Sequence, residues 1–327
     1  MQLPVDCSSS RTGVLCAGAL VLDTLVRPID AIHWGTTTFI ESIQPRVGGS
    51  AANTARALGI LGVSVRVAAS LGNDEAADVI RRELERCHVD DSFILAAEQP
   101  TPHTIVLVHS NGDRHFLHHK GCSETAFHTG LQFTPGLTAG IRHLHLASLF
   151  VVSNLRNQAA SILRGARAAG LTTSLDTCWD PQGEWMPVLS GCLPELDVLF
   201  MNEDEAAQIC AGNSLPETAR QILASGPSLL VIKQGSKGCR IFTQAAETIC
   251  PPYDVQPRDT TGAGDCFVAG FLAAYLEGAP PERAGLMGNA AGALSLPISG
   301  KTVCLSKLPM MGSDAGVCRA TSSLVVG

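Results

Sequence analysis

The sequence predicts an α/β protein in which helices cover both faces of a mostly parallel sheet, with a small β-sheet inserted near the start of the chain. Apolar, β-rich runs alternate with helical patterns from residue 143 onward, which is typical of successive βα units. Hydrophobic residues make up 45% of the 327 residues and charged residues 16%, as expected for strands buried on both faces. Asn111-Gly112, a strong hairpin signal, lies within an earlier β-rich run and predicts the small sheet.

The first part of the chain is expected to hold one central strand, two helices and the small sheet. Residues 13–22 form an apolar run that predicts a central strand and places Asp23 at its carboxyl end, where ligands bind in open α/β sheets. Residues 36–47 and 101–117 are rich in β-formers and are assigned to the small sheet. The second helix would take Asn73 as its N-cap. The two helices are expected over 50–61 and 73–87.

The remaining chain alternates strands and helices, which predicts a parallel sheet. The expected strands are near 143–147, 172–175, 198–201 and 229–232. The expected helices are near 154–169, 203–210, 216–225, 263–277 and 281–294, with a late antiparallel pair that starts at 240–242. The predicted organisation is a core of residues 13–35, 48–98 and 121–310, a small sheet of residues 36–47 and 99–120, and a tail of residues 311–327.

Composition excludes several classes of function. The formal net charge of −7 argues against a general polyanion-binding surface, so no nucleic-acid partner is expected. No apolar stretch reaches the ~18 residues that span a bilayer, so no membrane partner is expected either. The 12 cysteines are scattered and form no C-x-x-C pair, which argues against a zinc ribbon or a redox dithiol. We interpret most of them as buried small hydrophobes of a soluble, cytoplasmic protein.

The most informative segment is residues 259–267, where a glycine-broken turn precedes an apolar helix and Asp265 lies in its first turn. The N–H groups of Gly262, Ala263 and Gly264 are expected to be free at the helix N-terminus. Free amides and the positive end of the helix dipole form a cradle for an anion. Asp265 could also be no more than a helix cap. The two glycines favour a ligand site, because they let a ligand approach the backbone closely.

Several motifs resemble those of the ribokinase-like (PfkB) carbohydrate kinases. Residues 259–278 resemble the C-terminal signature of that family, and residues 47–55 followed by 71–74 resemble its N-terminal signature. Asn202-Glu203-Asp204-Glu205 is similar to its Asn-x-x-Glu element, and Gly235-Ser236-Lys237-Gly238 to its nucleotide-side turn. The resemblance covers about residues 13–302. It implies a ribokinase-like three-layer α/β/α core, a β-sheet lid over a sugar, and transfer of the γ-phosphoryl group of ATP to a hydroxyl of a small carbohydrate.

The resemblance also implies roles for particular residues. Asp265 would be the general base, with the amides of Gly262, Ala263 and Gly264 as the anion hole. The implied sugar-binding residues are Asp23, Gly48, Gly49 and Asn53. The implied nucleotide-binding residues are Lys233, Gly235, Gly238 and Asn289. The implied metal sites are Asn202 and Glu205 for Mg²⁺, bound through water, and Asp259 and Thr261 for K⁺.

Alternatives remain open at several of these positions. Asn202 could simply cap a helix with an acidic first turn, and Lys233, which stands where the family often has Thr, could be a solvated lysine at a strand end. Ser50 stands where many relatives carry Lys, which weakens the case for a phosphorylated sugar. Asp176 resembles the acid of an element found in some sugar-acid and fructose kinases, although the residues that follow it differ.

Two alternatives concern the whole protein. A nucleoside kinase would fit if the small apolar lid accepts a base, and a sugar-sensing relative without catalysis would keep the same fold. Competition among ribose, fructose and adenosine distinguishes a nucleoside kinase from a sugar kinase. A turnover assay distinguishes a non-catalytic sensor from an enzyme. An exposed sheet edge on the lid also invites a homodimer through paired lids.

Overall fold

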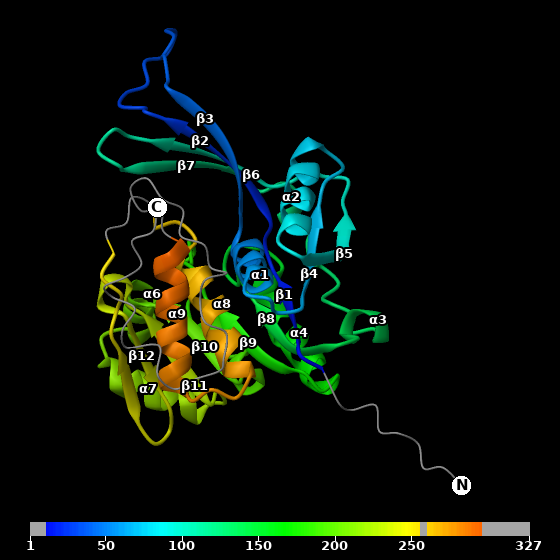
Figure 1. Ribbon diagram of the computed structural model, residues 1–327, viewed down its shortest axis with the longest axis vertical. Helices are drawn as coiled ribbons and strands as arrows, with labels where there is room; N and C mark the ends of the chain where they lie inside the picture. Colours follow the sequence, from blue (N-terminus) through cyan, green and yellow to red (C-terminus); the bar gives the residue numbers. More distant parts are fainter. Residues whose placement is uncertain (1–10, 256–259, 296–327) are drawn as a thin grey trace.

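Two β-sheets form the framework of the protein, which is represented by a computed structural model that describes residues 11–255 and 260–295 (Figure 1). The larger sheet has nine strands in the order β13-β12-β11-β10-β9-β8-β1-β4-β5. Its strands are β1 (Gly13–Ala17), β4 (Val65–Leu71), β5 (Val89–Ala96), β8 (Ile141–Leu146), β9 (Thr172–Asp176), β10 (Val198–Asn202), β11 (Leu229–Lys233), β12 (Cys239–Phe242) and β13 (Glu247–Cys250). All neighbours are parallel except the pairs that β12 makes with β11 and β13. The predicted parallel sheet and late antiparallel pair are confirmed.

Helices cover both faces of this sheet. The helices are α1 (Ser50–Ile60), α2 (Glu75–Arg86), α3 (Pro135–Thr138), α4 (Leu155–Ala168), α5 (Met186–Leu189), α6 (Glu203–Cys210), α7 (Leu215–Ala224), α8 (Ala263–Leu276) and α9 (Pro281–Ser295). One apolar core lies between the sheet and α1, α2, α8 and α9, and a second lies on the other face with α4, α6 and α7. Helix α8 is buried along most of its length, which explains its nearly continuous apolar sequence. Within the described residues, no helix is both long and apolar enough to cross a membrane.

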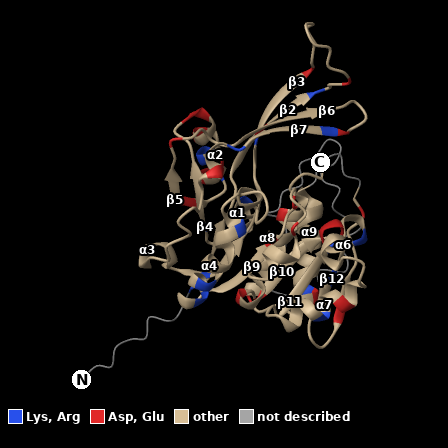
Figure 2. Cartoon of the chain, turned by 180° about the vertical axis from the view of Figure 1, so that it is seen from behind, with Lys and Arg blue, Asp and Glu red and all other residues tan. Residues whose placement is uncertain are grey.

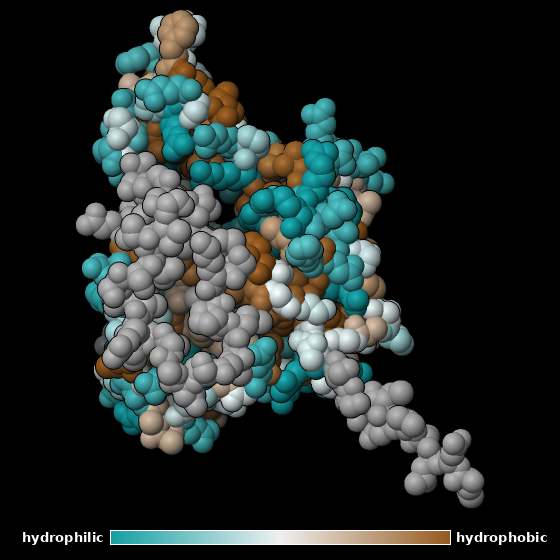
Figure 3. Space-filling model, viewed as in Figure 1, coloured by the Kyte–Doolittle hydropathy of each residue, from teal (hydrophilic) through white to brown (hydrophobic). Residues whose placement is uncertain are grey.

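A second, four-stranded sheet projects from one end of the body (Figure 1). This small sheet has the order β3-β2-β6-β7, with β2 (Val21–Arg27), β3 (Ser42–Gly48), β6 (His103–Val108) and β7 (Arg114–His119). The turn at Asn111-Gly112 joins β6 to the antiparallel β7, and Gly112 has a φ of 96°, as the hairpin signal predicted. Figure 3 shows apolar side chains on this sheet and at its tip.

The structure corrects the prediction for the first strand and the core that contains it. Residues 13–22 are not one strand, because β1 ends at Ala17 and β2 belongs to the small sheet. The chain changes sheets at Gly18, where φ is 152° and a Cβ would lie 2.6 Å from the Ala147 carbonyl oxygen. Asp23 therefore lies within a strand of the small sheet rather than at the carboxyl end of a central strand. The apolar run continues across the break because both strands bury side chains, so hydropathy does not mark the change.

A second correction concerns the start of α2. The N-cap is Asp74 rather than Asn73, and its carboxylate accepts a hydrogen bond from the Ala77 N–H at 2.9 Å. The same carboxylate also accepts hydrogen bonds from the N–H and the hydroxyl of Thr101, at 2.8 and 2.7 Å. Asp74 therefore ties the start of α2 to the segment that enters β6, a long-range role that local capping preferences do not reveal.

Candidate active site

Asp265 lies in the first turn of α8, beside the amide side chain of Asn53 from α1. Asn53 Nδ2 donates a hydrogen bond to Asp265 Oδ2 at 2.8 Å. Gly262, the N-cap of α8, has a φ of 77°, and a Cβ there would lie 3.3 Å from Asn53 Nδ2. Glycine at this position thus permits both the left-handed turn and the close approach of α1. Asn53 and Asp265 are 212 residues apart in sequence, and their hydrogen bond joins α1 to the first turn of α8.

The backbone donors at this helix end differ in one respect from the prediction. The Ala263 N–H donates to the Thr260 carbonyl oxygen at 3.1 Å, so the expectation of three unoccupied amides is wrong for Ala263. For the N–H groups of Gly262 and Gly264, the described part of the chain supplies no acceptor. As far as the described residues go, two amides and the positive end of the α8 dipole are therefore open to an anion.

Lys233 lies at the end of β11 and forms an ion pair with Asp176 at the end of β9. Lys233 Nζ donates to Asp176 Oδ1 and Oδ2 at 2.7 and 2.6 Å. The ammonium also lies against the first turn of α8, 3.5 Å from where a Cβ on Gly264 would be. The alternative of a solvated lysine is therefore wrong, since its side chain is only 13% exposed. Sequence reasoning could name both residues but not their pairing, which depends on the register of parallel strands.

Asp265 has an unusual protonation equilibrium. Burial raises its pKa from 3.8 to about 7, and the negative charges of Asp176 and Glu205 act in the same direction. The hydrogen bond from Asn53 and the charge of Lys233 partly oppose this rise in the pKa. A carboxylate with a pKa near neutrality is well suited to accept a proton from an alcohol.

Asn202 and Glu205 form a capping box at the start of α6. The Asn202 side chain accepts from the Glu205 N–H at 2.8 Å, and the Asn202 N–H donates to Glu205 Oε2 at 2.9 Å. The Thr177 hydroxyl also donates to Glu205 Oε2, at 2.8 Å. Burial raises the pKa of Glu205. The interpretation of Asn202 as a helix cap is therefore confirmed, and both of these donors to the Glu205 carboxylate engage the same oxygen, Oε2.

These residues fit a hydrated magnesium ion better than a directly bound one. Among the described residues, no group of three or more His, Cys, Asp or Glu side chains could hold a metal ion. No described residue donates a hydrogen bond to the second oxygen of Glu205, Oε1, so this oxygen could accept one from a water molecule of a hydrated ion, in keeping with the preference of Mg²⁺ for retaining several waters.

The residues that the sequence predicted to bind sugar lie near the junction of the small sheet and the body. Gly48 ends β3 against Asp23, so closely that a Cβ on Gly48 would lie 2.1 Å from Asp23 Oδ2. Gly49 has a φ of 90°, and a Cβ there would lie 2.4 Å from the Ala19 carbonyl oxygen. Both glycines are thus required by close packing, and Gly49 leads directly into α1, which carries Asn53. The structure brings together Asp23 and Gly48, and separately Asn53 and Asp265.

A hydrogen-bonded row crosses the small sheet to Asp23. Thr104 on β6 is the register partner of Asp23 on β2, and its hydroxyl hydrogen-bonds with the Asp23 carboxylate. The same hydroxyl lies 3.0 Å from Nδ1 of His118 on β7. Burial raises the pKa of Asp23, whereas the hydrogen bond from Thr104 and the nearby His103 lower it. The sequence alone did not place Thr104 and His118 near Asp23, because only strand register aligns these residues.

Three of the four predicted nucleotide-binding residues lie near one end of the hairpin formed by β12 and β13. Gly238 has a φ of 88°, and a Cβ there would lie 2.1 Å from the Cys250 carbonyl oxygen. Asn289 of α9 donates from Nδ2 to that carbonyl at 3.2 Å and to the Pro251 carbonyl at 2.8 Å. Gly235, with a φ of 57°, lies in the turn between β11 and β12, and a Cβ there would have no described atom within 4 Å. Gly238 and Asn289 therefore meet through Cys250.

The predicted K⁺ site is only partly described. Asp259 lies outside the described residues. Thr261 Oγ1 accepts a hydrogen bond from Arg114 Nη1 at the start of β7. This contact links the small sheet to the turn that precedes α8, and the guanidinium at Thr261 disfavours a monovalent cation on that hydroxyl.

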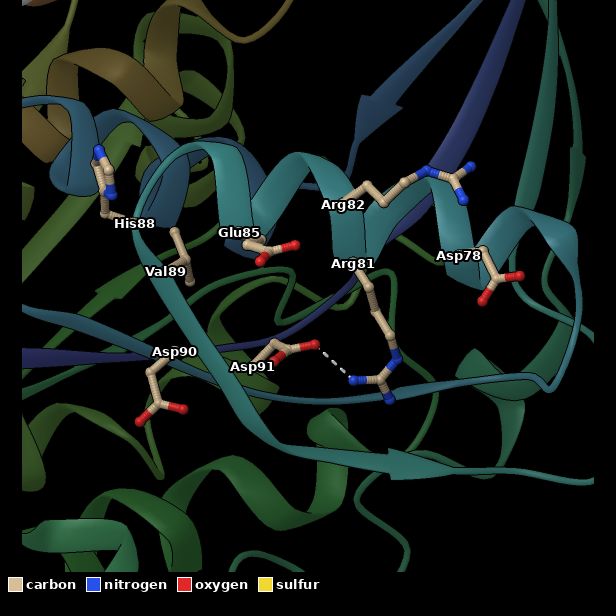
Figure 4. A pocket seen from close by; sticks show the side chains of 8 residues that line it. All are labelled: Asp78, Arg81, Arg82, Glu85, His88, Val89, Asp90 and Asp91. Carbon is tan, nitrogen blue, oxygen red and sulfur yellow. Dashed lines mark hydrogen bonds and ion pairs between the residues drawn. The ribbon is translucent and has the colours of Figure 1, made fainter.

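An open groove between α2 and β5 lies apart from these residues (Figure 4). Its walls carry both signs of charge, as Figure 2 also shows for α2. Arg81 points to Asp91 across the groove, with 2.6 Å between Nη1 and Oδ2, whereas Arg82 points away from it (Figure 4). Because these charges largely compensate one another and no α8 residue lines the groove, we do not assign the candidate site to it.

The arrangement of the two sheets and their helices defines the class of the protein. A nine-stranded, mostly parallel sheet with helices on both faces and a four-stranded sheet at one end is the ribokinase-like α/β fold. A solved structure of Arabidopsis thaliana ribokinase complexed with ribose and ATP is similar, with a TM-score of 0.78, 22% identity, and coverage of 91% of this chain and 99% of that one. At this identity the likeness shows the fold.

Sequence comparison gives the family. The pfkB family carbohydrate kinase model matches residues 14–308, so the chain belongs to this family of carbohydrate kinases. The ATP-dependent ribose-1-phosphate kinase of Halopiger xanaduensis is 32% identical over 286 residues, which is 86% of this chain and 91% of that protein. Fructokinase-2 of Zea mays is 28% identical over 233 residues, 69% of this chain and 70% of that protein. The resemblance inferred from the motifs is confirmed, and the chain is a carbohydrate kinase.

Proposed function

We propose that the protein transfers the γ-phosphoryl group of ATP to a hydroxyl of a small carbohydrate, with Asp265 as the base that removes the hydroxyl proton. The observation that carries this proposal is the Asp265 carboxylate, with its pKa of about 7, held by Asn53 beside the available amides of Gly262 and Gly264. A proton acceptor and anion donors at one helix end are what phosphoryl transfer to an alcohol requires.

In the proposed reaction, Asp265 accepts the proton as the sugar oxygen forms its bond to the γ-phosphorus and the bond to the ADP oxygen breaks. The N–H groups of Gly262 and Gly264 donate hydrogen bonds to the phosphoryl oxygens, on which negative charge is spread. Lys233 contributes positive charge close to the same turn. Two of its N–H groups are directed to Asp176, which leaves a third donor for a phosphate oxygen.

We propose that Asp23, Gly48, Gly49 and Asn53 form the sugar site. The close packing of Gly48 on Asp23 fixes the carboxylate from one side, and the Thr104 hydroxyl fixes it from the other. A carboxylate held in this way can accept hydrogen bonds from sugar hydroxyls in a defined geometry. The small sheet would close over the sugar as a lid and exclude water from the transferred group.

We propose that ATP lies against the turn at Gly235 and Gly238 and against Asn289. Mg²⁺ supplies charge neutralisation at the phosphates when bound, and the residues that would hold it through water are Asn202 and Glu205. A K⁺ site at Asp259 and Thr261 remains a prediction, which the position of Arg114 disfavours. The free cysteines fit a reducing compartment, and we propose the cytoplasm.

A substrate panel tests this function. Purified protein is incubated with ATP, Mg²⁺ and, in turn, ribose 1-phosphate, fructose, ribose and adenosine, and both ADP and the phosphorylated product are quantified. We expect one carbohydrate to give stoichiometric product and ADP. Product only from adenosine would favour a nucleoside kinase, and no product from any acceptor would favour a non-catalytic sensor.

We also propose that two copies pair through their small sheets. Ile43, Ile105 and Leu117 are exposed by 62%, 42% and 49%. Strand registers place these three side chains on one face of the small sheet, opposite to the face that carries Asp23. Contiguous exposed apolar surface of this kind is typical of an interface, and a contact there would leave the sugar-side face open.

A further inference from the structure

Two cysteines face each other across the hairpin that carries the proposed nucleotide turn. Cys239 on β12 and Cys250 on β13 are direct register partners, and neither side chain is exposed. Their thiols share a hydrogen bond, so the two sulfur atoms are neighbours. Of the nine cysteines in the described residues, these two form the cross-strand pair. The sequence did not reveal this pair, because the two cysteines form no C-x-x-C motif and only strand register brings them together.

The space around the two sulfur atoms is set by a glycine of α9. A Cβ on Gly285 would lie 2.6 Å from Cys250 Sγ and 3.2 Å from Cys239 Sγ. Gly285 therefore leaves room for both sulfur atoms side by side beneath the helix. The thiols also reach backbone oxygens of α9, with Cys250 Sγ 3.5 Å from the Glu282 carbonyl oxygen and Cys239 Sγ 3.9 Å from that of Gly285.

We propose that Cys239 and Cys250 form a reversible disulfide that lowers the affinity of the protein for nucleotide. The effect on affinity rests on the proposed nucleotide site, whereas disulfide formation does not. Cys239 follows Gly238 directly in the sequence, and the Cys250 carbonyl oxygen packs on Gly238 and accepts from Asn289. A covalent bond of about 2.05 Å is shorter than any contact between two thiols, so bond formation moves both strand ends beside these residues.

The chemistry requires a two-electron oxidant, such as a hydroperoxide. The hydrogen bond from Cys239 lowers the pKa of the Cys250 thiol, so Cys250 is the better nucleophile. Its thiolate attacks the peroxide, forms a sulfenic acid and releases hydroxide. The Cys239 thiol then condenses with the sulfenic acid, forms the S–S bond and releases water. In the balanced reaction, two thiols and one hydrogen peroxide give one disulfide and two waters.

Access to the buried pair depends on local opening of the hairpin. Strand β13 is an edge strand of only four residues, and exposed Pro251 and Pro252 follow it. Short edge elements open more readily than the sheet centre. Nucleotide bound against Gly238 and Asn289 would hold the hairpin closed. By linkage, if the disulfide weakens ATP binding by a given factor, ATP must shift the dithiol–disulfide equilibrium toward the dithiol by the same factor.

The test treats the full chain with hydrogen peroxide, with and without ATP and Mg²⁺, and quantifies the peptide that joins residues 239 and 250 by mass spectrometry. ATP affinity is measured by calorimetry on both redox forms. We expect the linked peptide, a roughly fivefold or larger loss of ATP affinity that a reducing agent reverses, and protection of the dithiol by ATP. Cys250→Ala and Cys250→Ser should abolish the linkage, whereas Cys192→Ala, a change at another buried cysteine, should leave it intact.

The outcomes separate this inference from the proposed function. If peroxide gives no 239–250 linkage in the wild-type chain, or links other cysteines equally, the disulfide proposal is wrong. If the linkage forms and ATP affinity stays the same, the regulatory role is wrong. Failure to phosphorylate any acceptor would contradict the proposed activity, while linkage and ATP affinity would still be measurable.

Discussion

The charge around Asp265 is set by a few residues from distant strands. Asp176 raises the pKa of Asp265, and Lys233 lowers it, while the two are paired with each other beneath the first turn of α8. The ion pair therefore keeps a nearly neutral unit beside the proposed base. Its separate charges should be visible in the pH dependence of the reaction.

Asp176→Asn should shift the pH profile of kcat/KM. A base acts only when ionised, so activity should rise with pH through a pKa of about 7 in the wild type. Removal of the negative charge of Asp176 favours ionised Asp265, so the midpoint of this rise should move to lower pH. Steady-state kinetics over a pH series measure the shift, with the exposed Asp78→Asn as the control that leaves it unchanged. A midpoint that moves upward would contradict the proposed electrostatics.

Gly48→Ala should weaken sugar binding selectively. A Cβ at this position would lie 2.1 Å from Asp23 Oδ2, so the carboxylate must move away from Gly48 and from the Thr104 hydroxyl. We expect the KM for the sugar to rise about tenfold, which corresponds to ~1.4 kcal/mol, with little change in the KM for ATP. Gly191→Ala is the matched control, because a Cβ there meets nothing closer than 3.8 Å. Equal effects on both KM values would argue against Asp23 as a sugar ligand.

Two helices with the same N-terminal motif allow a comparison at the scale of elements. Helix α6 begins with the capping box of Asn202 and Glu205, and at the start of α7 the N–H and the hydroxyl of Ser214 both donate to Glu217 Oε2. Asn202 and Glu205 lie beside the Asp176–Lys233 pair, whereas Ser214 and Glu217 are exposed on the surface. The caps of α6 and α7 should contribute similarly to the free energy of unfolding. Any effect that appears only when the α6 cap is changed therefore reports a role other than capping.

Asn202→Ala and Ser214→Ala should each destabilise the fold by about 1 kcal/mol through loss of the cap. Thermal unfolding measures this loss as a lower Tm for both variants. Only Asn202→Ala should raise the Mg²⁺ concentration needed for half-maximal activity, because the Asn202 side chain, which accepts from the Glu205 N–H, is one of the two groups proposed to hold the hydrated ion. If the two variants have the same Mg²⁺ requirement, the helix-cap role is sufficient and the proposed metal role is wrong.

The sequence predicted elements best where the signal was local. Asn202 as a possible cap and the acidic first turn after it indicated the start of α6, and Asn111-Gly112 placed the hairpin of β6 and β7. The switch from β1 to β2 at Gly18 was missed because both strands are apolar. The pairing of Lys233 with Asp176 and the row from His118 to Asp23 were missed because they depend on strand register between distant segments.

At the scale of the whole molecule, two places where the small sheet meets the body carry residues of the proposed site or contact its turn. Asp23 and Gly48 lie at its base, and Arg114 contacts Thr261 in the turn before α8. Closure over a sugar would therefore be coupled directly to the turn that carries the proposed anion donors. The opposite face carries Ile43, Ile105 and Leu117, so the proposed sugar site and the proposed contact with a second copy lie on different faces of the sheet.

Leu117→Glu should disrupt the proposed dimer. A charge within an apolar interface is costly to bury, so the variant should be monomeric at concentrations where the wild type is dimeric. Sedimentation velocity over a dilution series measures the two states. Ile249→Glu changes an exposed apolar residue on β13 and should leave the assembly unchanged. A monomeric wild type across the series would contradict pairing through the small sheet.

The most direct test of Asp265 as the general base is the turnover of Asp265→Asn. The amide keeps the size of the side chain but cannot accept the alcohol proton, so kcat should fall by roughly 10²–10⁴-fold while ATP affinity stays close to that of the wild type. The variant should also be more stable than the wild type above neutral pH, because it removes a carboxylate that the fold holds at a raised pKa of about 7. A kcat within a few-fold of the wild-type value would contradict the central claim.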